Sequence, residues 1–275
     1  MGPNRRPNGV YLAVCAIYRD EAPYLREWVA FHRLVGVEKF YLYNNRSTDD
    51  HLGALGPYLE DGTVEVRDWP LYPGQVAAYE DCMKRHSGDA RWIAFIDVDE
   101  FLFSPTKERV SDILVDYEEW PGVGVNRAVF GTSGHRTRPP GLVIENYLRR
   151  ASDANTPLPI KSIVDPTRVT SCHSCHTFLY RDGLAVDENK QPIDRPYAQT
   201  ETMSRSILRV NHYWTKSEEE LRVKFEKPDA RGKLRRGAAW NKALGGALNE
   251  EFDETITGYL PELREALQHA AYSVG

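Results

Sequence analysis

Three carboxylates stand in the otherwise apolar segment RWIAFIDVDEFLF, residues 91–103, which reads as a buried strand. Asp97 and Asp99 are two positions apart, so on an extended chain they point to the same side, about 6 to 7 Å from each other. Two carboxylates so placed repel each other unless a cation or a hydroxyl-rich ligand lies beside them. A hard divalent cation, Mn²⁺ or Mg²⁺, that is also bound by phosphate oxygens is the ligand that this spacing favours. The alternative is that the acids cap the following helix or form surface ion pairs.

Polar residues also follow two other predicted strands. The strand predicted over 10–21 ends in Arg19, Asp20 and Glu21, and the strand predicted over 38–45 runs into the polar loop NNRSTDD. In an open parallel sheet, ligands bind beyond the carboxyl ends of the strands, where the strand order switches. We therefore expect all these polar strand ends to lie at one ligand-binding edge.

The elements that position them alternate along the first hundred residues. Apolar residues at helical spacing, with Pro23 in the first turn and Gly36 as a stop, predict a helix over 23–37. A second helix is predicted over 74–88. Strands are predicted over 10–21, 38–45, 61–70 and 91–97. This alternation is typical of an α/β protein with an open sheet flanked by helices, which is the fold class that we predict.

The middle of the chain has a less regular pattern. Short strands are expected within 123–141, 157–169 and 206–217, and a helix is expected over 142–151. The polar, proline-containing segment 187–205 is expected to form a surface loop.

The helical, charged pattern of the last part of the chain begins at Glu218. Its basic stretch, 231–236, is either a solvated helix face or a contact for an anionic ligand. We predict a disordered arm over 1–9, a main domain over 10–216, and a C-terminal helical extension over 217–275 that packs on this domain.

The composition is that of a globular protein with a substantial core, with 41% apolar and 27% charged residues. A net charge of -5 and an isoelectric point near 5.9 argue against a nucleic-acid partner. The sequence has no apolar run of about 18 residues, which would predict a membrane span, and no secretory signal. Its four cysteines are too few for a disulfide scaffold of this length. We expect a cytoplasmic protein.

The segment SCHSCHTF, residues 171–178, offers a different kind of site. Cys172, His173, Cys175 and His176 are all possible zinc ligands. However, a structural zinc site usually draws its ligands from two separated pairs, and the chain has no second C-x₂-C. A zinc-binding interaction module, which would bind zinc without any nucleotide, is therefore the alternative interpretation.

Four segments together resemble glycosyltransferase family 92: YRDEAPYLREWVAFHRLVGVEKFYLYNNRSTDD, WIAFIDVDEFLF, VNRAVFGTSGH and NHYWTKS. They occur in the order of the family within about residues 10–236. The resemblance implies a GT-A fold, a nucleotide-sugar donor that is a UDP-sugar, a divalent cation on its diphosphate, and transfer to a hydroxyl acceptor with inversion. Eukaryotic family members are membrane-anchored, and no anchor is visible here, so the chain looks like a soluble bacterial-type member.

The resemblance also implies roles for residues near the acids. Asp99 looks like the metal ligand, and Asp97 like its partner, either a second ligand or a contact to the donor ribose or to a metal-bound water. His212 is similar to a C-terminal histidine that completes the metal site, and a neutral imidazole favours Mn²⁺ over Mg²⁺. The alternative for His212 is a core histidine bonded to backbone. Lys216 and Lys161 are candidates to neutralise a phosphate, unless they are ordinary surface lysines.

Further donor contacts are implied at the edge of the sheet. Asn45 and Asp49 are placed to meet the base or ribose, although these residue types are common in loops for purely local reasons. The residues at 19–21 are similar to the end of the first strand that lines the nucleoside. Gln75 matches a family position. His176 matches a family histidine, which implies a contact to the acceptor or the diphosphate.

Inversion requires a carboxylate that takes the proton of the acceptor hydroxyl. Glu145 is the first candidate for this base because it follows the loop that would shape the acceptor pocket, and Asp187 and Glu188 are alternatives. An ordinary glutamate on a helix face is the competing interpretation of Glu145. Arg127 and Ala128 depart from the Trp-Arg-like pair that is usual in the family, so the acceptor of relatives should not be copied to this chain.

Two further classes of protein stay open. A nucleotidyltransferase would share the sheet and the acids, but it should carry a glycine-rich loop after the first strand, and YRDEAP is not one. An inactive relative would be compatible with the substitution at Arg127.

Overall fold

The computed structural model describes residues 9–155, 159–194, 199–226 and 246–272. The predicted basic stretch 231–236 and nearly all of the predicted arm lie outside these ranges. Six strands form the central sheet, and in spatial order they are β3 Val64–Asp68, β2 Lys39–Asn44, β1 Val10–Tyr18, β4 Ala90–Phe95, β9 Lys161–Val164 and β6 Gly122–Val125.

The central sheet is mixed, and the order in which its strands follow one another reverses beside β1. Strands β3, β2, β1 and β4 are parallel, whereas β9 is antiparallel to both β4 and β6. Because β2 lies on one side of β1 and β4 on the other, the switch in strand order falls between β1 and β4. The predicted α/β class with an open mixed sheet is confirmed.

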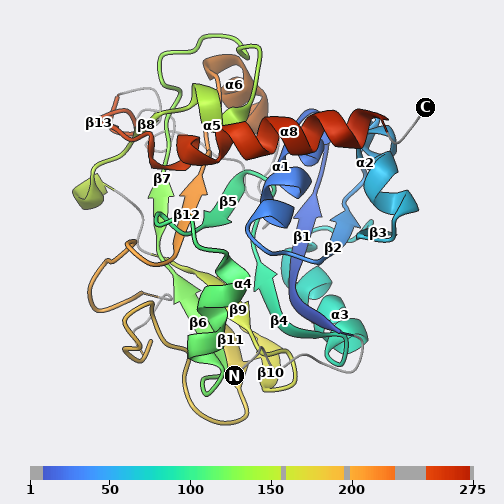
Figure 1. The fold of residues 1–275 in the computed structure, drawn as a ribbon, viewed down its shortest axis with the longest axis vertical. Helices are drawn as coiled ribbons and strands as arrows, with labels where there is room; N and C mark the ends of the chain where they lie inside the picture. The colour runs from blue at the N-terminus through green and yellow to red at the C-terminus, as the bar shows by residue number, and fades with distance from the viewer. Residues whose placement is uncertain (1–8, 156–158, 195–198, 227–245, 273–275) are drawn as a thin grey trace.

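Helices cover both faces of this sheet (Figure 1). The longer helices are α1 Ala22–Leu34, α2 His51–Glu60, α3 Gln75–His86, α6 Glu218–Glu226 and α8 Leu260–Tyr272. Helix α8 lies across α1 (Figure 1).

The two faces are visible in the alternation of side chains along β1. Leu12, Val14 and Ala16 belong to the core under α1 and α2, whereas Ala13 and Cys15 belong to the core under α3. The connection from β1 to β2 through α1 and the connection from β3 to β4 through α3 run in opposite directions along the sheet, so right-handed crossovers place α1 and α3 on opposite faces.

A second sheet continues from the end of β4. It consists of β5 Glu100–Phe103, β12 Arg209–His212 and β7 Arg127–Val129. In its register, His212 pairs with Glu100 on one side and with Val129 on the other. Two strand pairs complete the sheets: β10 Val169–Cys172 with β11 Phe178–Tyr180, and β8 Arg149–Arg150 with β13 Glu251–Phe252.

Short helical turns connect these strands. They are α4 Val110–Ile113, η1 Leu114–Tyr117, α5 Val143–Asn146, η2 Asp153–Asn155 and η3 Thr255–Tyr259. The helix expected over 142–151 is thus only the four-residue α5. The chain leaves helical geometry at Tyr147 and enters β8, which pairs with β13, so a tertiary pairing overrides the local pattern.

Two other parts of the fold differ from the sequence analysis. Helix α2 was not predicted because Gly53, Gly56 and Pro57 lie within it, and these residues usually disfavour a helix interior. The segment 187–205 is not simply a surface loop, because its first residue, Asp187, and the next one are buried.

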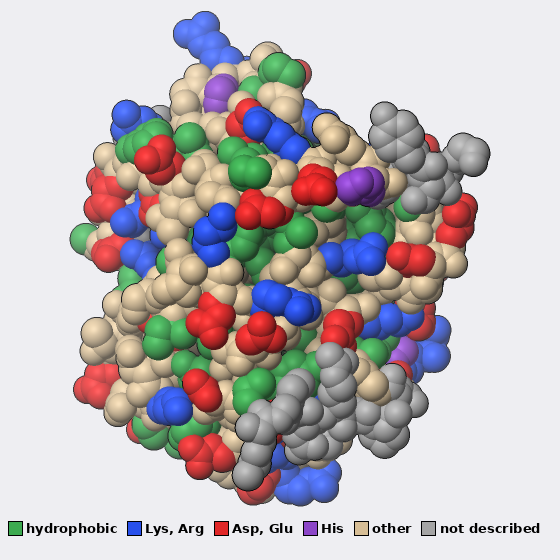
Figure 2. All heavy atoms as spheres, in the orientation of Figure 1, with side chains coloured by type: hydrophobic (Ala, Val, Ile, Leu, Met, Phe, Trp, Pro, Cys, Tyr) green, Lys and Arg blue, Asp and Glu red, His purple; other side chains and the backbone are tan. Residues whose placement is uncertain are grey.

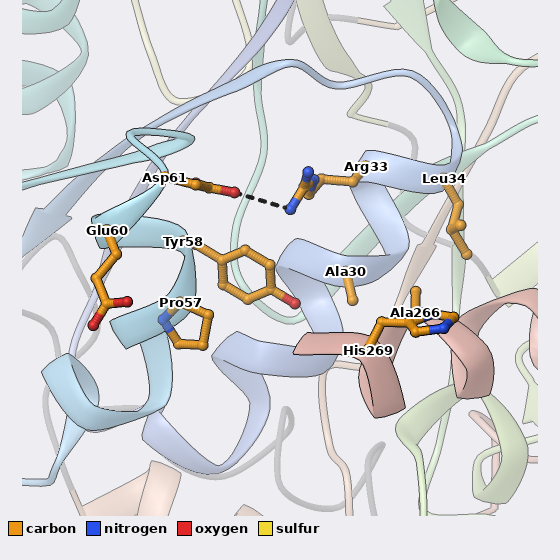
Figure 3. A pocket seen from close by; sticks show the side chains of 9 residues that line it. All are labelled: Ala30, Arg33, Leu34, Pro57, Tyr58, Glu60, Asp61, Ala266 and His269. Atoms are coloured by element: carbon orange, nitrogen blue, oxygen red, sulfur yellow. Dashed lines mark hydrogen bonds and ion pairs between the residues drawn. The ribbon is translucent and has the colours of Figure 1, made fainter. Parts of the chain in front are cut away.

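On the face in Figure 2, lysine, arginine, aspartate and glutamate side chains are interspersed. A hollow of about 670 Å³ between α1, α2 and α8 is crossed by the 3.4 Å ion pair of Arg33 and Asp61 (Figure 3). None of the predicted site residues lines it, so we do not place the site there. Within the described residues, no helix is long and apolar enough to cross a membrane.

Candidate functional site

The acids of the 91–103 segment lie in a turn where the chain passes from one sheet to the other. Strand β4 ends at Phe95 and β5 begins at Glu100. The turn is closed by the Glu100 N–H, which donates to the Asp97 carbonyl over 3.0 Å, and by the Asp97 N–H, which donates to Glu100 Oε2 over 2.9 Å. The expectation that Asp97 and Asp99 share one side of an extended strand is therefore wrong, because a turn aims them at different partners.

Asp97 faces α3 and β9. Its Oδ1 accepts a hydrogen bond from Gln75 Nε2 over 2.7 Å, and Tyr79 Oη lies 3.4 Å away. Its Oδ2 lies 2.7 Å from Lys161 Nζ. Gln75, predicted to be part of the site without a role, therefore orients the Asp97 carboxylate.

Asp99 faces β12 and α6. Its Oδ1 lies 3.4 Å from His212 Nε2, and its Oδ2 lies 2.7 Å from Lys224 Nζ, which also donates to the Trp214 carbonyl over 2.9 Å. Burial alone would raise the pKa of Asp99, but Lys224 and His212 hold it well below its usual range. Asp99 is therefore an ionised carboxylate at the edge of a cluster of charged side chains, which consists of Asp97, Asp99, Glu100, Arg127, Lys161, His212 and Lys224.

Glu100 connects the two halves of the cluster and is fully buried. Its carboxylate lies 3.0 Å from Lys161 Nζ, 3.4 Å from an Arg127 guanidinium nitrogen, and 3.6 Å from His212 Nδ1. Burial would raise the pKa of Glu100, but the charges of Lys161, His212 and Arg127 lower it below its usual range. Lys161, predicted to meet a phosphate, is itself buried between two carboxylates, which raise its pKa above the usual value, and so it balances acids of the protein.

The imidazole of His212 has partners for either neutral tautomer. Arg127 donates to Nδ1 over 3.2 Å, which leaves the hydrogen on Nε2, facing Asp99. With the hydrogen on Nδ1 instead, the ring faces the Glu100 carboxylate, and the Nε2 lone pair becomes available to a metal. His212 is thus bonded to charged side chains through its ring, and not to backbone as in the competing interpretation.

These donors fit a divalent cation through two protein ligands. Asp99 Oδ1 and His212 Nε2, 3.4 Å apart, are close enough for one ion to bind both. Asp97 points toward Gln75 and Lys161, and in the described part of the chain no group of three His, Cys, Asp or Glu side chains is arranged to hold a metal. A cation held by one or two side chains completes its shell with phosphate oxygens and waters.

The ends of β1 and β2 form the predicted nucleotide edge. The loops after these strands are joined because Asp20 accepts hydrogen bonds from the Thr48 N–H and hydroxyl, and Asp49 accepts one from the Ala22 N–H. Asn45 donates to the backbone carbonyls of Trp69 and of the second residue after it. These three side chains therefore shape the loops.

Two basic residues at this edge differ in exposure. Arg19 is 47% exposed and pairs loosely with the neighbouring Asp20. Lys216 is largely buried, lies 2.9 Å from Glu21, and places its Nζ 3.3 Å from the centre of the Tyr24 ring. Its φ of 50° is uncommon for a residue other than glycine and fixes this side chain beside the cluster. Lys216 also lowers the pKa of Asp99, by less than Lys224 and His212 do.

His176 lies against the buried side of the cluster. Its Nδ1 is 2.9 Å from the Ile160 carbonyl. Burial, with the charges of Lys161 and Arg127, lowers its pKa to about 3, so the ring is neutral. The neighbouring Cys172 donates its thiol to the carbonyl of Ser174.

The structure does not bring the predicted bases to the cluster. Glu145 forms an ion pair with Arg264 of α8, over 2.5 Å. Asp187 accepts the backbone N–H groups of residues 189 and 191, so it stabilises its own turn. Glu188 accepts five hydrogen bonds, from the N–H groups of 206, 207 and 208 and from the hydroxyls of Ser204 and Ser206, which identifies it as a structural clamp.

Three residues of the cluster had no predicted role. Glu100 was quoted with the acids, and Arg127 was noted only as a departure from the family. Lys224 was not singled out, although it follows Glu220 by one helical turn on a predicted helix and therefore lies on the same face. Lysine at the end of a charged helix is too common to be noticed without the fold.

An open α/β sheet with acids, a histidine and lysines at its switch point is an arrangement typical of proteins that bind phosphorylated ligands at that edge. The family model of glycosyltransferase family 92 matches residues 8–242. The chain therefore belongs to glycosyltransferase family 92.

The chain is similar to longer proteins of this family. A family 92 protein of Arabidopsis thaliana is 27% identical over 285 residues, which cover 92% of this chain and 49% of the relative. The beta-1,4-galactosyltransferase galt-1 of Caenorhabditis elegans is 25% identical over 254 residues, which cover 86% of this chain and 51% of the relative. The chain thus spans about half the length of these relatives. They come from a plant and a nematode, so they give no support to the expectation of a bacterial-type member.

Among solved structures, S. aureus TarS, residues 1–349, aligns with 94% of this chain and 81% of that chain, at 12% identity and a TM-score of 0.42. A likeness at this level carries no information about ligands.

Proposed function

We propose that this chain is a metal-dependent, inverting glycosyltransferase that moves a sugar from a nucleotide diphosphate, a UDP-sugar, to a hydroxyl acceptor. The observation that carries the proposal is the pairing of Asp99 with His212 at the switch point of the sheet. Family membership supports the reaction class, and the edge between β1 and β4 supports a ligand that extends from the first strand end to the acids.

The residues of the cluster have distinct tasks in this proposal. Asp99 Oδ1 and His212 Nε2 would hold the cation, Mn²⁺ or Mg²⁺, and the cation would supply electrostatic stabilisation of the leaving diphosphate. Glu100 lies behind the His212 ring, 3.6 Å from Nδ1, in the place that carboxylates often take behind metal-binding histidines. Asp97, held by Gln75, is the partner that meets the donor ribose or a metal-bound water.

The other side chains of the edge bind the donor. Lys216 contributes positive charge beside Asp99, and Asn45 and Asp49 hold the loop that contacts the base. Arg19, with its exposed side chain, and Glu21, which pairs with Lys216, border the nucleoside.

A hexose is the proposed sugar, and galactose is the first to test. The relative from C. elegans is named a beta-1,4-galactosyltransferase, and a similar chain from Arabidopsis thaliana is named a galactan beta-1,4-galactosyltransferase. The second similarity is 31% over 116 residues, 38% of this chain and 22% of the relative. Since Arg127 replaces the usual residue of the acceptor segment, the acceptor is proposed only as a hydroxyl-bearing glycan.

The acceptor proton needs a carboxylate that can receive it. Of the three predicted bases, Glu188 is held by hydrogen bonds to segment 204–208, and the buried Asp187 already accepts two backbone N–H groups at Oδ1. Glu145 is partly exposed, and among the described residues its carboxylate pairs with Arg264, so it is the candidate that we retain although it lies away from the cluster. Replacement of Glu145 by Gln would then lower turnover without weakening donor binding, whereas Asp187→Asn would affect stability.

The test is release of UDP from UDP-galactose, with Mn²⁺ or with a chelator, in the presence of a short galactan as the acceptor. We expect turnover that needs the cation and that falls about a hundredfold or more in Asp99→Asn. Asp182→Asn, which changes an exposed carboxylate paired with Arg168, is the matched control and should behave as the wild type. Turnover that does not change in Asp99→Asn would overturn the proposed site.

A further inference from the structure

Lys224 is the cation that faces Asp99 in this structure, and its position is set by α6. The helix begins with a reciprocal pair of hydrogen bonds: Ser217 N–H donates to Glu220 Oε2 over 3.1 Å, and Glu220 N–H donates to Ser217 Oγ over 3.3 Å. Glu220 also accepts hydrogen bonds from the hydroxyls of Tyr24 and Tyr147. With its first turn so fixed, the helix places Lys224, one turn later, against Asp99.

The acids around Asp99 lie against cations of the protein. Within the described residues, Asp97 and Glu100 contact Lys161, Glu100 contacts Arg127, and Asp99 contacts Lys224, at 2.7 to 3.4 Å. Lys216 and Glu21 form a further pair beside them. A cation that approaches Asp99 therefore meets the Lys224 ammonium.

A largely buried cluster of paired charges resists single charged ligands. A divalent cation that binds alone adds two positive charges where water is scarce, and a diphosphate that binds alone adds negative charge beside three carboxylates. A cation and a diphosphate that bind together nearly cancel. The arrangement thus favours joint binding of the two over binding of either one.

Lys224 is the most exposed of the three cations. The Lys161 and Arg127 side chains are 1% and 7% exposed, whereas that of Lys224, which donates to Asp99 and to the Trp214 carbonyl, is 29% exposed and lies near the end of α6. Its flexible four-carbon stem carries a compact ammonium group that can turn from one anion to another over a short distance.

We propose that Lys224 occupies the cation side of Asp99 when no donor is bound and turns to the diphosphate when the cation and the nucleotide bind, so that cation binding depends on the nucleotide. This inference rests on the proposed function and adds to it a diphosphate-binding residue and a reason for joint binding. A lysine that only stabilised α6 would affect neither ligand.

The experiment compares the wild type with Lys224→Met, which keeps the length of the stem and removes the charge. Free Mn²⁺ is measured by electron paramagnetic resonance without UDP, and UDP binding is measured by calorimetry in saturating Mn²⁺. We expect Lys224→Met to bind Mn²⁺ alone about tenfold more tightly and UDP about tenfold more weakly, since one positive charge has been removed next to both ligands. The two effects have opposite signs, which loss of structure cannot produce.

Two controls define where the ligands bind. Arg222→Met removes a positive charge from the exposed face of the same helix, where the arginine is 63% exposed and pairs with Glu218, and it should bind both ligands as the wild type does. Lys224→Met combined with Asp99→Asn should lose the gained Mn²⁺ affinity. If the gain persists without the Asp99 carboxylate, the ion binds elsewhere and the inference is overturned.

The results distinguish this inference from the proposed function. If the wild type binds UDP only with Mn²⁺ but Lys224→Met binds Mn²⁺ alone no more tightly, the assigned role of Lys224 is overturned and the proposed function stands. If the wild type binds neither UDP nor Mn²⁺ under any of these conditions, the proposed function fails and the inference fails with it.

Discussion

Replacement of Glu100 by Gln tests whether the cluster is held together by its central carboxylate. Glu100 is fully buried and contacts Lys161, Arg127 and His212, and its Oε2 also accepts the Asp97 N–H. The glutamine has the same shape but no charge. It leaves the Lys161 ammonium, which is buried, with Asp97 as its remaining carboxylate.

The expected cost follows from the burial of these groups. Removing one partner of a buried, hydrogen-bonded ion pair typically destabilises a protein by about 3 to 5 kcal/mol, because the remaining charge is left uncompensated. For a domain of this size, about 1 kcal/mol lowers the melting temperature by roughly 2 to 4 °C. We therefore expect Glu100→Gln to melt roughly 6 to 20 °C below the wild type.

The assay is urea unfolding together with thermal unfolding at pH 7, where the wild-type carboxylate is ionised. Glu262→Gln is the matched control, because Glu262 is a surface glutamate that is 53% exposed and lies 3.3 Å from Lys107. Exposed pairs contribute about 0 to 1 kcal/mol, so the control should stay close to the wild type.

A double substitution separates the lost charge from the lost shape. Lys161→Met in the Glu100→Gln background removes the ammonium that has lost one of its two carboxylates, so the double variant should be less destabilised than the sum of the two single variants. If Glu100→Gln unfolds within about 1 kcal/mol of the wild type, the carboxylate does not hold the cluster as described.

Three further predictions concern residues behind the site. Burial raises the pKa of Glu27 to about 7 despite two backbone N–H donors, so the folded state keeps a proton that the unfolded chain loses from about pH 4.5 upward. The wild type therefore loses stability as the pH rises from 5 to 8, and Glu27→Gln does not. Relative to the wild type, Glu27→Gln should gain up to about 3 kcal/mol over this range, measured by urea unfolding. Burial lowers the pKa of His32 to about 3, so the stability that the neutral ring contributes is present above pH 6.5 and is lost as the pH falls. Between pH 7 and pH 5, the wild type should therefore lose about 2 kcal/mol more unfolding free energy than His32→Gln. Equal losses in the two proteins would contradict this. Ser217→Ala removes the cap of α6 and should cost about 1 kcal/mol in thermal unfolding, an effect that a fraying helix end would not show.

Much of the fold could be predicted because the local pattern and the final structure agree. Strand β1 and helix α1 have apolar residues at the correct spacing, with Pro23 in the first turn, and tertiary contacts only reinforce that preference. Helix α2 could not be predicted from local propensity, since the glycines and the proline within it are tolerated through packing. The short α5 was overpredicted because the chain after Asn146 is drawn into the pair of β8 and β13, whereas the first N–H groups of α5 are capped by the distant Glu27.

The candidate site, like the fold, could be predicted only in part. Asp97 and Asp99 were recognised because residue type and spacing suggested chemistry, and Gln75 because it matches a family position; the structure brings the three to one edge. Which partner each acid meets could not be predicted, because a turn directs the two aspartates apart. The role of Lys224 could not be predicted from the sequence, since it depends on how α6 packs against the site and not on the neighbours of Lys224 in the sequence.

The most direct test of the central claim is the thermal shift of the wild type and of Asp99→Asn with UDP, with and without Mn²⁺. UDP at a hundred times its dissociation constant should stabilise the folded wild type by about 2.7 kcal/mol, a rise of roughly 5 to 10 °C, only when Mn²⁺ is present. Asp99→Asn should lose this rise, whereas the control Asp182→Asn should keep it. A shift that does not need Mn²⁺, or one of the same size in Asp99→Asn, would contradict a metal-bound diphosphate at Asp99.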